Sequence, residues 1–300
     1  MRRRVSRRRN PGGARVPYFR QTRRVPPWPE TKQPENRVRR WIRAIALCVL
    51  PMAAMAQDTG LQSLETSEAG RDWMAVGRLD IDGTGFCTGA LISPTLVLTA
   101  AHCLFDKATR QRIDPSRIEF LAGWRRGRAS AYRAARQAVI HPDYDYDGKA
   151  TVTRVRHDIA LIELWQPIRN TAVIPFETGY RPSRGEDVGV VSYAHDRAEA
   201  PSLQEVCSVM ARQSGVLVMS CDVDFGASGA PIFSFSGDHP RIVSVVSAKA
   251  ELEGKRVALG TALEESLEVL QAELSAGRGF GLSGGTSGAG KNLGARFVRP

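Results

Sequence analysis

The sequence predicts an all-β fold, on two observations. Short runs rich in β-branched and aromatic residues recur from Trp73 onward, each bounded by turn residues. A helical pattern, by contrast, is legible in one segment near the C-terminus. The runs expected to form strands are Trp73–Ile81, Leu91–Ala100, Arg117–Trp124, Ile159–Trp165, Val188–Tyr193, Val216–Cys221 and Arg241–Ser247. Strands at this spacing are typical of a β-sandwich or of β-barrels, and the pattern alone leaves both open.

The helical segment begins at Thr261-Ala262-Leu263-Glu264, which has the residue types of a capping box. Four leucines then recur at helical spacing: Leu263, Leu267, Leu270 and Leu274.

The sequence divides the chain into four regions. Residues 1–56 are a basic extension with an export signal, 57–72 a polar and irregular segment, 73–276 the folded domain, and 277–300 a flexible Gly/Ser-rich tail.

The positive charge of the chain is concentrated at its N-terminus. Residues 1–43 hold 15 Lys and Arg against Glu30 and Glu35, a net charge of +13. The whole chain has 42 basic and 31 acidic side chains, which leaves 27 basic and 29 acidic ones for residues 57–300, a net charge of −2. A domain that binds nucleic acid carries a basic face of its own, so no nucleic-acid partner is expected.

The end of the extension has the pattern of a secretory signal. The basic flank Arg39–Arg43 precedes the apolar run Ala44–Met52, and Ala54-Met55-Ala56 has the small-x-small pattern of a cleavage site. The apolar run is too short to span a bilayer, so no stable membrane insertion is expected after cleavage. The residues before it either form a disordered basic arm or precede the true translation start, for instance at Val38, and we favour the second reading. The expected location is a bacterial periplasm or the extracellular space.

Export places the chain in an oxidising compartment, where cysteines pair. Cys48 leaves with the signal, and the other four cysteines allow three pairings. Cys207 and Cys221 flank a polar turn near residues 212–215, so they can face each other across a hairpin. Cys87 and Cys103 bracket the strand–turn–strand segment that ends at His102.

Three short motifs carry the chemistry of the chain. They are Thr99-Ala100-Ala101-His102-Cys103, the run that begins His157-Asp158-Ile159-Ala160-Leu161, and Gly226-Ala227-Ser228-Gly229-Ala230-Pro231. A serine hydroxyl becomes a nucleophile when a neighbouring imidazole accepts its proton and a carboxylate orients that imidazole. Glycines beside the serine free backbone N–H groups for an oxyanion. The chain therefore presents a base, an acid and a nucleophile in the order His, Asp, Ser.

These three motifs resemble those of the trypsin/chymotrypsin-like serine proteases, over a stretch from about Trp73 to Leu274. The resemblance implies two antiparallel six-stranded β-barrels with the site between them, and a C-terminal helix packed on the second barrel. It makes His102 the general base, Asp158 its orienting acid and Ser228 the nucleophile, with the Gly226 and Ser228 amides as the oxyanion hole. It also implies the disulfides 87–103 and 207–221. His157 is expected on the opposite face of the strand from Asp158.

The chain departs from the digestive members of this family directly before the nucleophile. Those enzymes have an Asp there that pairs with a new N-terminal Ile, whereas this chain has Ala227 and no Arg-Ile-Val-Gly-Gly cleavage site. We therefore expect no zymogen activation of that kind, as in the bacterial glutamyl-endopeptidase-like branch.

The substrate preference is open at this point. Asp222 stands six residues before Ser228, where trypsin-like enzymes keep the acid that pairs with Arg or Lys. Ser247 and Lys249, near the expected pocket wall, are the other candidate substrate-binding residues, and Lys249 also offers a competing partner for Asp222. Val246 replaces the His that glutamate-specific relatives have, which argues against glutamate specificity.

No cofactor or metal is expected for the chemistry. The loop His141-Pro142-Asp143-Tyr144-Asp145-Tyr146-Asp147 has alternating acids that suggest a calcium site, but their spacing fits no known calcium loop. A solvated acidic loop is the favoured reading.

Taken together, the motifs and the export signal predict an exported serine endopeptidase that acts on proteins or peptides. The alternatives are a catalytically silent binding module of the same fold and an esterase-like acyl hydrolase.

Overall fold

The computed structural model describes residues 60–147, 151–179 and 182–281. The predicted export signal, the basic extension and most of the C-terminal tail lie outside these residues. Helices among them are short: η1 (Arg71–Trp73), η2 (Ala101–Leu104), η3 (Pro115–Arg117), α1 (Val152–Arg156) and α2 (Glu264–Ser275). None of them combines the length and apolar composition that a membrane-crossing helix needs.

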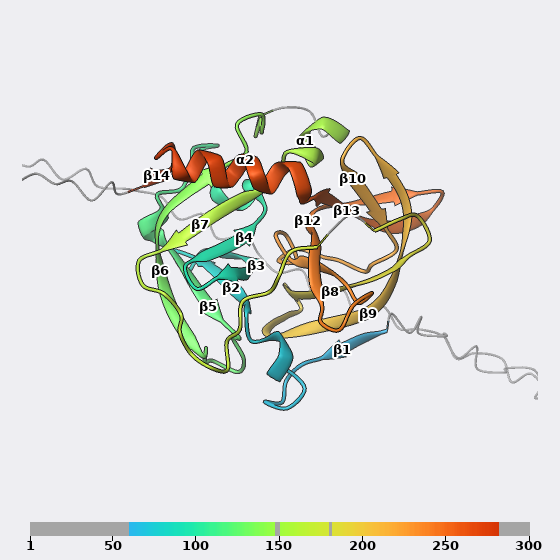
Figure 1. The fold of residues 1–300 in the computed structure, drawn as a ribbon, viewed down its shortest axis with the longest axis horizontal. Coiled ribbons are helices and arrows are strands. Elements are labelled where there is room, and N and C mark those ends of the chain that lie inside the picture. The colour runs from blue at the N-terminus through green and yellow to red at the C-terminus, as the bar shows by residue number, and fades with distance from the viewer. Residues whose placement is uncertain (1–59, 148–150, 180–181, 282–300) are drawn as a thin grey trace, which may run out of the picture. The chain divides into compact units, whose positions relative to one another are not determined.

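The strands form two closed antiparallel barrels (Figure 1). The first runs in the order β6-β5-β2-β3-β4-β7 and closes through β6–β7 pairing. Its strands are β2 (Val76–Ile81), β3 (Gly85–Ser93), β4 (Leu96–Thr99), β5 (Ile118–Ala122), β6 (Ala131–Ile140) and β7 (Ala160–Leu164). The prediction of two six-stranded barrels is confirmed.

The second barrel runs in the order β9-β10-β13-β12-β11-β8 and closes through β8–β9 pairing. Its strands are β8 (Asp187–Ala194), β9 (Arg197–Gln213), β10 (Val216–Met219), β11 (Pro231–Ser234), β12 (Arg241–Leu252) and β13 (Lys255–Ala262). One short strand is added to each barrel, β1 (Leu61–Ser63) on β9 and β14 (Phe280–Gly281) on β6.

Two clusters of buried apolar residues form the core, and the larger one extends from the first barrel into the second through residues such as Tyr193, Phe233 and Val245. The inward-facing residues of β2 to β7 pack together with Trp73 and with Leu263, Leu267 and Leu270 of the C-terminal region. A second cluster fills the other barrel with side chains of β8 to β13, for example Val190, Met219 and Ile232. Because the larger cluster crosses from one barrel into the other, burial of its apolar surface holds the two barrels together.

The C-terminal helix forms as predicted, but its start and its docking differ from the prediction. Leu263 is the N-cap residue and no side chain caps the helix. The capping box fails because Thr261 belongs to β13 and its hydroxyl donates instead to the carbonyl of Val155. The helix makes its main strand contacts with β6 and β7, so it packs chiefly on the first barrel, whereas the second was expected.

Three further expectations are corrected. The run Leu91–Ala100 is not one strand, because β3 and β4 form a hairpin that turns at Pro94 and Thr95. The segment 57–72 is not irregular where it is described, since β1 pairs with β9 and Leu64 is buried. The tail does not begin at 277, because Phe280 and Gly281 pair with β6.

Candidate active site

His102 lies in η2, the turn that follows β4 at the end of the first barrel. The next residue, Cys103, forms a disulfide with Cys87 of β3, so a covalent link fixes the turn to the barrel wall. The second disulfide joins Cys207 and Cys221 beside the β9–β10 hairpin. Both pairings are those expected from the sequence.

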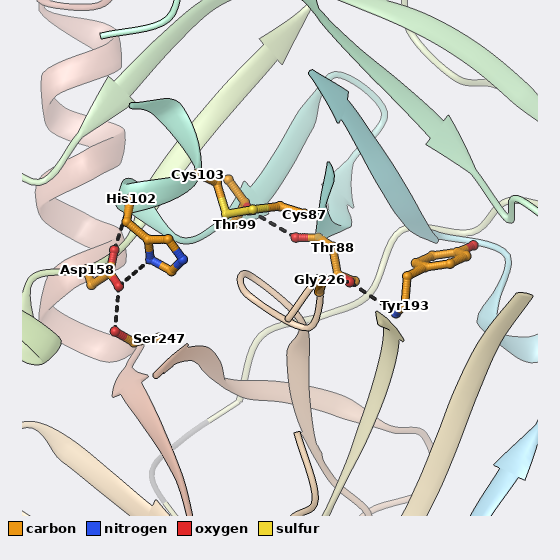
Figure 2. The surroundings of a disulfide bond; sticks show 9 residues. All are labelled: Cys87, Thr88, Thr99, His102, Cys103, Asp158, Tyr193, Gly226 and Ser247. Atoms are coloured by element: carbon orange, nitrogen blue, oxygen red, sulfur yellow. Dashed lines mark hydrogen bonds and ion pairs between the residues drawn. A yellow bond between two sulfur atoms is a disulfide. The ribbon is translucent and has the colours of Figure 1, made fainter. Parts of the chain in front are cut away.

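Asp158 lies between α1 and β7, and its side chain is only 5% exposed. Its Oδ1 accepts the backbone N–H of His102 at 2.8 Å, and its Oδ2 lies 2.7 Å from His102 Nδ1. The hydroxyl of Ser247 donates to the same Oδ2 at 2.5 Å (Figure 2). A buried carboxylate needs such partners, and together they hold the imidazole in one orientation. Because Nδ1 faces the carboxylate, Nε2 is the ring nitrogen left for a reaction.

Ser228 lies in the loop between β10 and β11 of the second barrel, and this loop packs against the segment that carries His102. Its carbonyl accepts the backbone N–H of Thr88 at 2.9 Å. At Gly229, where φ is +78°, a Cβ atom would lie 2.1 Å from Thr99 Oγ1, so only glycine fits this close approach. The Ser228 loop of the second barrel therefore contacts Thr88 of β3 and Thr99 of β4 in the first barrel.

Thr88 connects the Ser228 loop to the first barrel through its side chain as well. Its hydroxyl donates to the carbonyl of Gly226 at 2.8 Å and accepts the backbone N–H of Tyr193 at 3.1 Å. The hydroxyl of Thr99 in turn donates to the carbonyl of Thr88 at 3.0 Å (Figure 2). Sequence reasoning missed Thr88, although it directly follows Cys87.

The backbone N–H groups expected to bind the oxyanion are free to donate to a substrate. Among the described residues, the N–H groups of Gly226 and Ser228 have no hydrogen-bond acceptor within the protein, whereas that of Ala227 donates to the carbonyl of Asp224 at 2.9 Å. The backbone at Gly226 has φ +98°, a conformation that glycine adopts freely. Two unpaired N–H groups beside a serine are the arrangement that stabilises an oxyanion.

The three residues assigned to substrate binding have different surroundings. Ser247 contacts Asp158, so it supports the His–Asp pair. Lys249 Nζ lies 2.6 Å from Asp224 and over the ring of Phe225, and its hydrogen bond is the main cause of the lowered pKa of the Asp224 carboxyl. The backbone N–H of Asp222 donates to the side chain of Gln204 at 2.7 Å. Lys249 thus pairs with Asp224 instead of Asp222.

A groove of about 250 Å³ opens beside the His–Asp pair. Its lining combines His102, Asp158 and Ser247 with two basic side chains and an aromatic one: Lys107, Arg154 and Tyr146. A larger cavity, about 880 Å³, is lined by Trp73, Phe176 and His239 among others and includes none of the predicted catalytic residues. The larger volume therefore does not coincide with the predicted catalytic residues.

The acidic loop that suggested calcium does not gather its carboxylates within the described residues. Asp147 pairs with Arg110 at 3.1 Å, and Asp145 accepts the backbone N–H of Asp147. Asp143 lies instead beside two histidines. The group Cys87, His102 and Cys103 offers no thiolate for a metal, because its sulfurs form a disulfide.

Comparison with known proteins identifies the family of the chain. The family model "Trypsin" matches residues 63–259, more than half of the chain. A glutamyl endopeptidase of Bacillus licheniformis is 27% identical over 154 residues, which are 51% of this chain and 46% of that protein. A peroxisomal leader peptide-processing protease of Mus musculus is 29% identical over 189 residues, 61% of this chain and 29% of that protein. The chain thus spans less than half the length of these curated relatives.

A solved structure described as a Glu endopeptidase in complex with MPD has the same fold. It superposes with a TM-score of 0.61 at 19% identity, covering 73% of this chain and 98% of that one. At this identity the likeness concerns the fold alone, which is the double barrel already described. With the family model matched over both barrels, the chain belongs to the trypsin family of serine proteases.

Proposed function

We propose that the chain is a serine endopeptidase that cleaves proteins or peptides through an acyl-enzyme on Ser228. The observation that carries the proposal is the buried Asp158 carboxylate, 2.7 Å from His102 Nδ1, together with the close approach of Gly229, next to Ser228, to Thr99 and Ala100 just before His102. Burial and three hydrogen bonds keep this carboxylate in place, so the imidazole is preset as a base.

In the proposed reaction Ser228 Oγ attacks the peptide carbonyl while His102 Nε2 accepts the hydroxyl proton. The negative charge that develops on the carbonyl oxygen is stabilised by the open N–H groups of Gly226 and Ser228. His102 then gives the proton to the leaving amine, and the acyl group remains on Ser228. A water molecule, deprotonated by His102, hydrolyses this ester and restores the serine.

The test is covalent labelling of the purified full chain with a fluorophosphonate probe, followed by mass spectrometry of its peptides. We expect one label per chain, on Ser228, because the probe reacts only with a serine activated by a base and an oxyanion hole. A protein that stays unlabelled would contradict the proposal and favour a binding module. An active protein that hydrolyses esters but no peptide would favour the esterase alternative.

We further propose that the oxyanion loop is formed without a newly released N-terminus. Ala227 is fully buried and carries no charge to receive an ammonium group. The loop is held instead from the first barrel by Thr88, whose N–H and hydroxyl bind the carbonyls of Ser228 and Gly226. These bonds exist in the chain as it is, so labelling by the probe should require no further N-terminal cut.

Thr88→Val tests this role, because valine keeps the shape and removes the hydroxyl. We expect kcat to fall at least about tenfold, a fraction of the 10² to 10³ that one oxyanion donor is worth. KM should change little, since the substrate does not touch Thr88 in this proposal. Thr88→Ser retains the hydroxyl and should recover most of kcat. An unchanged kcat in Thr88→Val would mean that the loop is fixed by other contacts.

For substrate preference we propose that Asp222 selects Arg or Lys before the cut bond. Lys249 pairs with Asp224, so Asp222 is not neutralised by that lysine. The position of Val246, which is buried, carries no imidazole to bind a glutamate side chain. A carboxylate in the specificity pocket favours a cationic side chain by charge-assisted hydrogen bonds.

Asp222→Asn should lower kcat/KM for Arg and Lys peptides about 100-fold, because hydrogen bonds to charged groups are worth about 1.5–3 kcal/mol. Peptides with an uncharged residue at the same position should be cleaved as before. The matched control is Asp187→Asn, an exposed aspartate of the same barrel that is bonded to Ser208 and not to Lys249, which should leave the preference unchanged. Equal losses for all peptides, or cleavage after glutamate, would overturn the assignment.

Export remains part of the proposal. The two disulfides among the described residues support an oxidising compartment, as in secreted proteins. N-terminal sequencing of the protein recovered outside the cytoplasm should give a chain that begins at Gln57.

A further inference from the structure

The groove beside the His102–Asp158 pair carries positive charge that the proposed chemistry does not use. Among the described residues that line it, two are basic, Lys107 and Arg154, and Asp158 is the one carboxylate. Both oxygens of Asp158 already have partners, which are the N–H and Nδ1 of His102 and the hydroxyl of Ser247. An acidic group that enters the groove therefore meets two cations, with which it can form charge-assisted hydrogen bonds.

Lys107 is the exposed cation of the groove. It belongs to a turn built by its neighbour Asp106, whose Oδ1 accepts the backbone N–H of Thr109 at 2.7 Å. Asp147, in the acidic loop, pairs with Arg110 at 3.1 Å. Over residues 60–147, 151–179 and 182–281, no carboxylate forms an ion pair with Lys107. Its ammonium group can therefore bind a carboxylate of a substrate.

Arg154 is the second cation, and aromatic side chains hold it in place. Its Nη2 donates to the hydroxyl of Tyr144 at 3.5 Å, and its guanidinium carbon lies 5.6 Å from the ring centroid of Tyr146. Aromatic rings attract a guanidinium group without cancelling its charge. Arg154 belongs to α1, which ends at the C-cap residue His157 directly before Asp158. His157 and Asp158 thus do not share a strand, contrary to the sequence prediction.

The position of the groove indicates which substrate residue it faces. In an extended peptide, successive side chains point to opposite sides. If the residue before the cut bond points to Asp222 of the second barrel, the residue preceding it points the other way, to the groove beside His102. The groove measures about 250 Å³, less than the roughly 300–1,000 Å³ of pockets that take a whole small molecule. Its size suits a single side chain.

We propose that Lys107 and Arg154 select a glutamate or aspartate side chain at the substrate residue that precedes the one facing Asp222. The inference rests on the proposed peptidase function and adds a second recognition element to it. Asp222 binds a cation directly before the cut bond, and the groove binds an anion one residue earlier. A basic side chain at the earlier position is disfavoured, because it meets like charges in the groove.

The test compares two peptides that differ only in Glu or Gln at this position, with Arg directly before the cut bond. The full chain should cleave the Glu peptide with a kcat/KM about threefold to fivefold higher, the upper range for an exposed ion pair. In about 1 M NaCl the ratio should approach one, because the Debye length falls to about 3 Å from about 10 Å at 0.1 M salt. Equal kcat/KM for both peptides at low salt would overturn the proposal.

Variants identify the residues that select the acid. In Lys107→Glu the ratio of Glu to Gln cleavage should fall to one or below, and Lys107 is exposed, so the change leaves the core intact. Arg154→Gln should lower the ratio as well, and a general loss of activity does not alter a ratio measured on one enzyme. The matched control is Lys255→Glu, an exposed lysine of β13 outside the groove, which should keep the parent ratio. A parent ratio in both groove variants would overturn the proposal.

A binding measurement separates this inference from the proposed peptidase function. The full chain carrying Ser228→Ala is titrated into the same two peptides, labelled with fluorescein, and the anisotropy is recorded. The Glu peptide should bind with a Kd about threefold to fivefold lower than that of the Gln peptide. Tighter binding of the Glu peptide, with neither peptide cleaved by the parent, would support the inference and contradict the peptidase function. Equal or undetectable binding of the two peptides would overturn the inference, whatever the activity.

Discussion

Replacing Ser228 by alanine is expected to lower kcat for a peptide substrate about 10⁶-fold, the loss found when the nucleophile of such a triad is removed. The reason is that Ser228 supplies the hydroxyl that forms the acyl-enzyme in the proposed reaction. Binding should persist, because the backbone N–H groups of Gly226 and Ser228 remain. The measurement is peptide hydrolysis at matched enzyme concentration, together with loss of the fluorophosphonate label.

The matched control is Ser247→Ala, which removes a hydroxyl from the same site without touching the nucleophile. Ser247 donates to Asp158, so its loss should reduce kcat only about tenfold, the size of one ordinary hydrogen bond. A double variant, Ser228→Ala with His102→Ala, should be no slower than Ser228→Ala alone, since the two groups act as a unit. Activity in Ser228→Ala within a few hundredfold of the parent would mean that another residue is the nucleophile.

The parts of the site that sequence could predict are those encoded in short local motifs. The turn that holds His102 and the glycines around Ser228 are local features, so their residue types appear together in the sequence. The pairing of His102 with Asp158 joins residues 56 positions apart, and it followed from the order of the motifs and their resemblance to a known family. The closed barrels followed from the same resemblance, because strand pattern alone fits a sandwich equally well.

The parts that sequence could not predict depend on contacts between distant segments. The hydroxyl of Thr88 meets the carbonyl of Gly226 across 138 positions, and nothing in the local sequence marks that contact. The longest strand, β9, lies outside the predicted runs because it contains Pro201 and several charged residues. Thr261 fits a capping box locally. In the fold it pairs with Val216 in the sheet and its hydroxyl donates to the carbonyl of Val155, so it does not cap the helix.

Replacing Asp158 by asparagine is the second large effect, with kcat expected to fall about 10⁴-fold, as in other triads whose acid is changed to the amide. The hydrogen bonds explain why. Oδ1 accepts the backbone N–H of His102, so an amide NH₂ placed there would face another donor. The asparagine oxygen therefore occupies this position, and the NH₂ group points at His102 Nδ1.

An NH₂ group donating to Nδ1 forces the proton of the imidazole onto Nε2, and a protonated Nε2 cannot accept the hydroxyl proton of Ser228. Ser247 adapts to the change, because its hydroxyl can accept from the NH₂ group as readily as it donates to the carboxylate. The fold should therefore survive, and the melting temperature should drop far less than the activity. The measurement is kcat at neutral pH beside thermal unfolding of both proteins. A variant that retains a tenth of the parent activity would show that Asp158 does not set the tautomer of His102, and the base would then have to be oriented by the protein around it.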